Sequence, residues 1–255
     1  MSTNNGYDPG LAGVLAAETY LSHVDGLKGE LIIGGFPLAE LAANATFEET
    51  VFLLWNGRLP GQTELTELKN ELAGLRPLPA ATINLLREAA RAHTTPMDAL
   101  RMAAATLDVG SGDADHQQTA KTIVARIATI VASYHRLRQG QEPVMPNPKL
   151  SHAANFLYML SGEKPSDARV RGLETYLNTV VDHGLNASTF AARVIIATQS
   201  DLVSAITGAI GALKGPLHGG APGPALDTVF EIGTADRAEA VLQAKLDAGE
   251  RLMGF

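Results

Sequence analysis

Apolar side chains recur along most of this chain at the spacing of one helical face. The stretch from Gln117 to Arg138 is the longest, with apolar residues on one side at Ile123, Ile127, Ile130, Val131 and Tyr134. The same periodicity predicts further helices at about residues 63–75, 80–92, 96–107, 150–161, 166–182, 188–198, 201–213, 222–232 and 235–252. This helical pattern predicts an all-α fold. No fixed-period repeat occurs, which argues against a solenoid.

Capping residues mark two of the predicted helix starts. Thr46 stands three residues before Glu49, which is the spacing of a capping box, and the helix that follows should end near Gly57. Thr95 precedes Pro96, and proline fits the first helical position because its missing N–H is not needed there. Both sites predict sharply defined helix starts.

Three segments interrupt the helical pattern. In Gly26–Phe36, glycines flank the apolar run Leu31–Ile33, which predicts a short strand or hairpin as the only β structure. Asp108–His116 gathers glycine, serine and three aspartates; it lacks the EF-hand spacing and a closing glutamate, so a solvated loop is favoured over a calcium site. Residues 143–148 hold three prolines and are a candidate hinge or linker.

Composition and charge narrow the class of protein. The chain has 255 residues, 45% hydrophobic, 18% charged and 5% aromatic, a balance that suits a soluble helical protein with a sizeable core. The net charge of −7 and the lack of basic runs argue against nucleic acid as a partner. There is no cysteine, no signal peptide in Met1–Gly10, and no apolar run near the ~20 residues of a membrane span. We therefore expect a cytoplasmic protein with no membrane partner.

The first candidate site is the segment Asp182–Asn186. His183 and Asn186 can both donate hydrogen bonds near a helix terminus, and Gly184 permits the turn that directs them to one side. In the alternative interpretation, His183 caps the preceding helix and interacts with its C-terminal dipole. The spacing alone leaves both open.

The second candidate site is the segment Gly215–Gly220, which joins two apolar helices. Glycines on both sides leave the imidazole of His218 accessible, and the positive end of a helix that starts near Pro222 would disfavour the imidazolium. A histidine held neutral in this way can donate a hydrogen bond to a carbonyl that gains negative charge. The alternative is a glycine-rich connector with an incidental histidine.

No other motif adds a cofactor or a metal. His93 and His152 sit at predicted helix ends, and His23 and His116 lack a partner at ligand spacing, so no metal site is predicted. Gly208–Lys214 lacks the phosphate-loop pattern, and no dinucleotide fingerprint or nucleophile elbow occurs.

Four blocks together resemble the citrate synthase family. They are Gly10–Ala42, Phe47–Pro60 (FEETVFLLWNGRLP), the segment DHGLNASTFAARV from Asp182, and GPLHGG from Gly215. They occur in order over nearly the whole chain, so their combination is far more specific than any one block.

The resemblance implies a mostly α-helical fold and a homodimer built by helices of the large domains. Family members condense oxaloacetate with acetyl-CoA to citryl-CoA and then hydrolyse it, with no cofactor beyond the coenzyme A thioester substrate. By the match to GPLHGG, His218 would polarise the thioester carbonyl and stabilise the enol. By the match to DHGLN, His183 would bind oxaloacetate with the help of Asn186.

Departures from the family pattern qualify these expectations. The family segment GFGHRVY supplies a second histidine, and a catalytic aspartate follows later; this chain stops at Gly254-Phe255. We therefore expect residues 1–255 to be a citrate synthase large domain, with the small domain largely absent and the isolated chain inactive. Ala221-Pro222-Gly223 replaces a common Asn-Glu, which leaves a 2-methylcitrate synthase using propionyl-CoA open. A non-catalytic helical dimerisation module is the third hypothesis.

Overall fold

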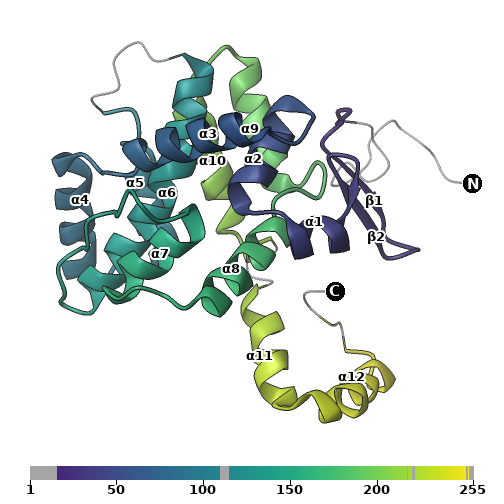
Figure 1. Ribbon diagram of the computed structural model, residues 1–255. Coiled ribbons are helices and arrows are strands. Elements are labelled where there is room, and N and C mark those ends of the chain that lie inside the picture. The colour runs from purple at the N-terminus through teal and green to yellow at the C-terminus, as the bar shows by residue number, and fades with distance from the viewer. Residues whose placement is uncertain (1–15, 110–114, 217, 220–221, 251, 253–255) are drawn as a thin grey trace, which may run out of the picture. The chain divides into compact units, whose positions relative to one another are not determined.

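The computed structural model describes residues 16–109, 115–216, 218–219, 222–250 and 252. Over these ranges the chain is mainly helical with one small antiparallel sheet, which confirms the predicted fold class (Figure 1). The chain forms two compact units. The first comprises Met1–Gly74 and Pro146–Asn186, and the second comprises Leu75–Met145 and Ala187–Phe255. One crossing between the units, from Met145 to Pro146, lies in the proline-rich break predicted as a linker.

The sheet of the first unit has the order β1-β2-β3. Strand β1 (Ser22–Asp25) pairs antiparallel with β2 (Glu30–Ile33), and β2 pairs antiparallel with β3 (Phe36–Pro37). The predicted segment Gly26–Phe36 supplies the turn and β2, whereas the partner strand β1 lies before its predicted start. The third strand was not predicted, because two residues are too few to show an alternating pattern.

The first unit contains five helices among its described residues: α1 (Leu38–Asn44), α2 (Phe47–Asn56), α3 (Gln62–Leu75), α7 (His152–Ser161) and α8 (Asp167–Thr179). The capping box at the start of α2 is confirmed: the Glu49 N–H donates to the Thr46 hydroxyl, and the Thr46 N–H donates to the Glu49 carboxylate over 2.7 Å. A small apolar core joins the sheet to α1 and α2 through Ile33, Leu41, Ala45 and Leu53.

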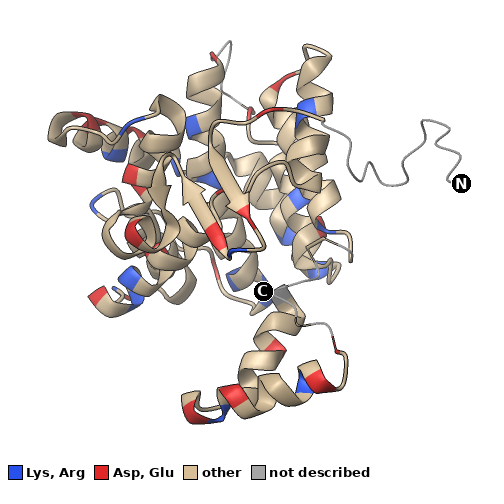
Figure 2. Cartoon of the chain, turned by 90° about the vertical axis from the view of Figure 1, so that its right-hand side faces the viewer, with Lys and Arg blue, Asp and Glu red and all other residues tan. Residues whose placement is uncertain are grey.

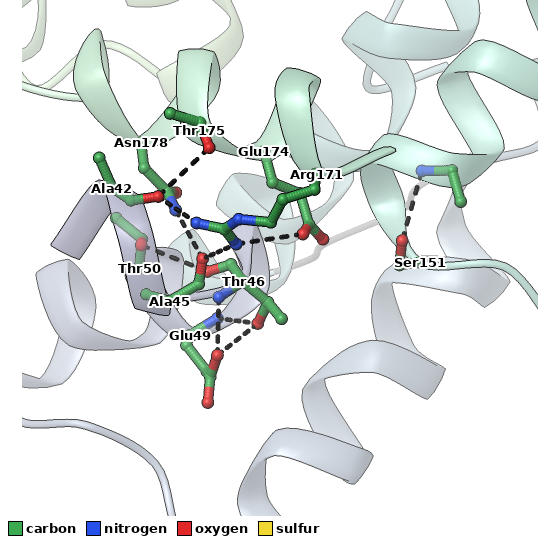
Figure 3. Close-up of polar contacts among 11 residues, drawn as sticks. Ala42, Ala45, Thr46, Glu49, Thr50, Ser151, Arg171, Glu174, Thr175 and Asn178 are labelled. Atoms are coloured by element: carbon green, nitrogen blue, oxygen red, sulfur yellow. Dashed lines mark hydrogen bonds and ion pairs between the residues drawn. The ribbon is translucent and has the colours of Figure 1, made fainter. Parts of the chain in front are cut away.

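Polar side chains of α8 fasten the C-terminal end of α1 (Figure 3). The Arg171 guanidinium donates to the carbonyls of Ala42 and Ala45, the latter over 2.9 Å. The Asn178 amide donates to the same Ala45 carbonyl over 2.8 Å. The last carbonyls of a helix lack intrahelical partners, so these contacts replace the missing bonds and fix α8 against α1.

The second unit holds α4 (Ala80–Arg91), α5 (Pro96–Ala104), α6 (His116–Arg138), α9 (Ala187–Ala197), α10 (Leu202–Leu213), α11 (Pro222–Ile232), a 3-10 turn η2 (Ala235–Arg237) and α12 (Ala238–Asp247). The predicted start at Thr95 and Pro96 is confirmed, with the Asp98 N–H donating to the Thr95 hydroxyl. Three predicted helices were too long: the one at 96–107 ends at Ala104, the one at 235–252 ends at Asp247, and in the first unit the one at 166–182 ends at Thr179.

The core of the second unit lies among α4, α5, α6 and α10. Ile123, Ile130 and Tyr134 of α6 are buried, as predicted from their spacing. Val131 was wrongly placed on this face and is 37% exposed, because it lies about 100° round the helix from Ile130. Helices α9 and α10 run side by side (Figure 1).

The predicted loop at 108–116 is seen only at its edges. Residues 110–114 lie outside the described residues. Asp115 caps α6 by accepting from the Gln118 N–H over 2.7 Å, and α6 begins at His116, one residue earlier than predicted.

Charge and hydropathy add two findings about the described residues. Lysines and arginines are spread over separate helices and interspersed with acidic residues (Figure 2). Among the described residues, no helix combines the length and the apolar character that crossing a membrane requires.

Candidate functional site

The turn that carries His218 folds back onto the end of α10. Lys214 caps that helix, its N–H donating to the Ile210 carbonyl over 3.0 Å. The N–H groups of His218 and Gly219 then both donate to the Gly215 carbonyl, each over 3.0 Å. Two hydrogen bonds to one carbonyl make this a tight turn and not an extended connector.

Gly219 is required by a close backbone approach. A Cβ atom at this position would overlap the carbonyl of Leu213, the last residue of α10. The glycine next to the histidine therefore does more than leave the ring accessible, because it lets the turn lie directly against the helix end.

Ser188 is the side chain that contacts the candidate histidine. Its hydroxyl oxygen lies 2.7 Å from His218 Nε2, and His218 is half-buried. Ser188 stands in the first turn of α9, which packs along α10, so helix packing brings residues 30 positions apart into contact. A serine hydroxyl can donate to or accept from a ring nitrogen, so this contact orients the imidazole in either tautomer.

Ser188 was missed by the sequence reasoning. It lies five residues after His183 in the same family-like segment, but only the packing of α9 on α10 links it to His218. A hydroxyl in the first turn of a helix is more often a capping residue, so this position carried no separate signal of a catalytic contact.

An ion pair lies at the start of this turn. Lys214 Nζ forms an ion pair with Asp98 near the start of α5. The hydrogen bond from Lys214, followed by that from Thr95, holds the pKa of the Asp98 carboxyl below its usual range. This carboxylate is therefore ionised at neutral pH.

The segment of His183 lies between α8 and α9. Helix α8 ends at Thr179, and its end is met by the Val180 N–H, which donates to the Tyr176 carbonyl over 3.2 Å. His183 is exposed and lies four residues beyond the helix. The structure thus gives the helix a backbone cap and does not use His183 for that purpose.

Gly184 makes the turn that the sequence predicted. Its φ is +88°, in the left-handed region that favours glycine. The Gly184 N–H donates to the Asp182 carboxylate over 3.4 Å, and the Asn186 N–H donates to the Gly184 carbonyl over 3.1 Å. His183 and Asn186 belong to the first unit, and His218 belongs to the second.

Other histidines have local structural surroundings. His152 is buried at the start of α7. Its backbone N–H donates to the Glu48 carboxylate over 2.8 Å, and the centre of its ring lies 4.7 Å from that of Phe47. His93 follows α4 with a left-handed φ of +53°. Over the described ranges, no group of three or more histidines or acidic residues could hold a metal ion.

Comparison with known proteins assigns the family. The family model described as "Citrate synthase, C-terminal domain" matches residues 10–255. The chain belongs to the citrate synthase family. It is 41% identical to the citrate synthase of Haloferax volcanii, over 96% of this chain and 68% of that protein.

Two further relatives bear on specificity and fold. The 2-methylcitrate synthase of Mycobacterium tuberculosis is also 41% identical, over 96% of this chain and 63% of that protein. The crystal structure of the citrate synthase from Pyrobaculum aerophilum superposes with a TM-score of 0.83 at 40% identity, over 96% of this chain and 65% of that one. The chain spans about two thirds of the length of these family members.

Proposed function

We propose that this chain provides the carbonyl-polarising histidine and the oxaloacetate-binding loop of an enzyme that condenses oxaloacetate with acetyl-CoA to citrate and CoA. One observation carries the proposal: His218, whose backbone N–H is bonded to the Gly215 carbonyl, has a ring nitrogen 2.7 Å from the Ser188 hydroxyl oxygen. Family membership supplies the reaction class, and this contact supplies a reason for the histidine to act as a fixed donor.

In this proposal His218 stabilises the enol of the acyl thioester. In this assignment the Ser188 hydroxyl is the donor to Nε2, which leaves the ring proton on Nδ1. The Nδ1–H then donates to the thioester oxygen as negative charge develops on it, which lowers the barrier to removal of a proton from the adjacent carbon.

His183 and Asn186 are proposed to bind oxaloacetate. An exposed imidazole and an amide at the two ends of a tight turn offer hydrogen-bond donors for carboxylate and keto oxygens. Two carboxylates are bound strongly only where arginine forks neutralise them, so these two residues alone should give weak affinity. A calorimetric titration of residues 1–255 that gave micromolar oxaloacetate binding would contradict this.

The second candidate is a 2-methylcitrate synthase that uses propionyl-CoA. The Mycobacterium tuberculosis relative with that name is as similar to this chain as the Haloferax volcanii citrate synthase, at 41% identity each. Ala221-Pro222-Gly223 directly follows the turn of His218 and departs from the Asn-Glu of many members. The ratio of kcat/KM for the two acyl-CoA substrates distinguishes the candidates.

A homodimer is proposed from the apolar surface of α9. Phe190 and Val194 are one helical turn apart on this helix and are 38% and 52% exposed. A groove of about 390 Å³ between α9 and α10, lined mainly by alanine, leucine and isoleucine, adds apolar surface on a different face of α9. A second copy of the chain is the occupant that family membership suggests for this surface.

The experiment adds a separate polypeptide that carries the family segment GHRVY and the residues after it. Residues 1–255 alone should give no turnover with oxaloacetate and either acyl-CoA, whereas the mixture should form citrate or methylcitrate. Association of the two polypeptides is checked by sedimentation. Association without turnover would reject the enzymatic proposal and favour a non-catalytic dimerisation module. Two statements stay predictions: that residues 1–255 form the large domain, and that the protein is cytoplasmic.

A further inference from the structure

An ion pair links the start of the His218 turn to a different helix. Lys214, the C-cap of α10, donates from Nζ to Asp98 Oδ1 on α5, 116 residues away in the sequence. The two side chains are 38% and 27% exposed. Ion pairs at this exposure add little to the free energy of unfolding, so folding stability does not account for the pair.

Asp98 is itself held in one orientation. Its Oδ2 accepts from the Thr95 hydroxyl over 2.7 Å, and its N–H donates to the same hydroxyl oxygen over 3.3 Å. The guanidinium Nη2 of Arg101 lies 3.7 Å from Asp98 Oδ1 and adds positive charge beside the same oxygen. Helix α5 packs against α10. The lysine therefore meets a carboxylate that is fixed by its own helix.

The turn after Lys214 has little freedom to absorb movement. Lys214 is bonded to the Ile210 carbonyl, and the His218 and Gly219 N–H groups both return to Gly215. Gly219 lies too close to the Leu213 carbonyl for any Cβ. These contacts tie His218 and Gly219 to Gly215 and Leu213, so we expect a displacement at Lys214 to reach His218.

We infer that Asp98 and Lys214 are positioning residues for His218, which set the distance and orientation of its ring relative to Ser188. Neither residue touches the proposed reacting atoms. The effect on catalysis rests on the proposed function, whereas the effect on the ring itself does not.

The test measures the His218 ring directly. The 255-residue chain is labelled with ¹⁵N-histidine, and the ring resonances are assigned by comparison with His218→Gln. Lys214→Gln and Asp98→Asn should each shift the His218 ring nitrogens, and Lys214→Arg, which keeps the ion pair, should restore the wild-type positions.

The matched control is Glu142→Gln. Glu142 forms an ion pair with Arg87 of α4, also between distant segments of the second unit, and neither residue belongs to the turn, to α9 or to α10. Its loss should leave the His218 resonances unchanged. Far-ultraviolet circular dichroism and melting curves show that each variant is folded.

Activity in the two-polypeptide mixture gives the second readout. Lys214→Gln should lower kcat roughly tenfold with a much smaller change in KM, because a ring misplaced by a fraction of an ångström still leaves the substrate sites intact. Unchanged His218 resonances in both Lys214→Gln and Asp98→Asn would overturn the inference, whatever the activity. Shifted resonances in a mixture that makes neither citrate nor methylcitrate would uphold the inference and reject the proposed function.

Discussion

Two residues other than glycine, His93 and Gln199, have a left-handed backbone among the described residues, with φ of +53° and +65°. His93 follows the C-terminal end of α4, and Gln199 follows that of α9. The left-handed region costs an L-residue about 1–2 kcal/mol, which glycine avoids. These positions therefore store local strain at helix ends.

We predict that His93→Gly is more stable than His93→Ala by about 1 kcal/mol, since only glycine relieves the strain. The control is Arg91 in the last turn of α4, where the order should reverse, with Arg91→Ala more stable than Arg91→Gly by a similar amount. Urea unfolding of the four variants measures this. An alanine variant at residue 93 as stable as the glycine variant would show that no strain is present.

Ser188 gives the second prediction at the scale of single residues. Ser188→Ala removes the hydroxyl beside His218 Nε2. Because the ring then loses the contact that orients it, kcat of the two-polypeptide mixture should fall by about 10- to 100-fold. Ser204→Ala, which removes a hydroxyl bonded to Asp201 at the start of α10, should leave kcat within about twofold. Equal rates for both variants would remove Ser188 from the site.

At the scale of elements, the start of α3 depends on one carboxylate. Glu64 accepts from the Gly61 N–H over 2.8 Å and from both terminal nitrogens of Arg58. Hydrogen bonds from Arg58, then from Gly61, lower the pKa of Glu64 from 4.5 to about 2. The folded state thus prefers the ionised carboxylate, and its contribution to stability is present above pH 4.5 and lost as the pH falls towards 2.

We therefore predict that Glu64→Gln flattens the fall in the free energy of unfolding between pH 4.5 and 2. Urea unfolding across this range compares the variant with the wild type. Glu67→Gln removes the same charge from the same helix and serves as the control. If the two variants had the same pH dependence, the Arg58–Glu64 contact would not contribute in solution.

How far the sequence predicts these elements depends on whether their signals are local. The capping box of α2 and the start of α5 were predicted because each uses residues within three positions of one another. Helix α1 was missed because it has only seven residues, begins after Pro37 without a side-chain cap, and is fastened at its end by Arg171 and Asn178 of α8. Those fastening bonds span more than 120 positions and leave no pattern in the local sequence.

At the scale of the whole molecule, the proposed dimer surface gives one prediction. Val194→Asp places a charge on the exposed apolar face of α9 and should convert a dimer to a monomer, because a buried unpaired carboxylate is costly at an interface. Leu246→Asp, at an equally exposed apolar residue of α12, should leave the mass unchanged. Sedimentation equilibrium measures both. A dimer that persists in Val194→Asp would place the interface elsewhere.

The family and the helical fold could be predicted from the sequence, because four blocks occur in order and the apolar period is clear. The contacts of the site could not. Ser188 reaches His218 through the packing of α9 on α10, and Asp98 reaches Lys214 through the packing of α5 on α10. Each contact depends on tertiary structure, so spacing along the chain identified the histidine without its partners.

His218 is proposed to polarise the thioester carbonyl in a citrate-forming condensation. This is tested by measuring product formation in the two-polypeptide mixture for the wild type and for His218→Ala. His135→Ala, on the exposed side of α6, is the control histidine variant. We predict a loss of about 10²- to 10⁴-fold for His218→Ala and a wild-type rate for His135→Ala. A folded, associated His218→Ala protein that forms citrate or methylcitrate at the wild-type rate would contradict the account.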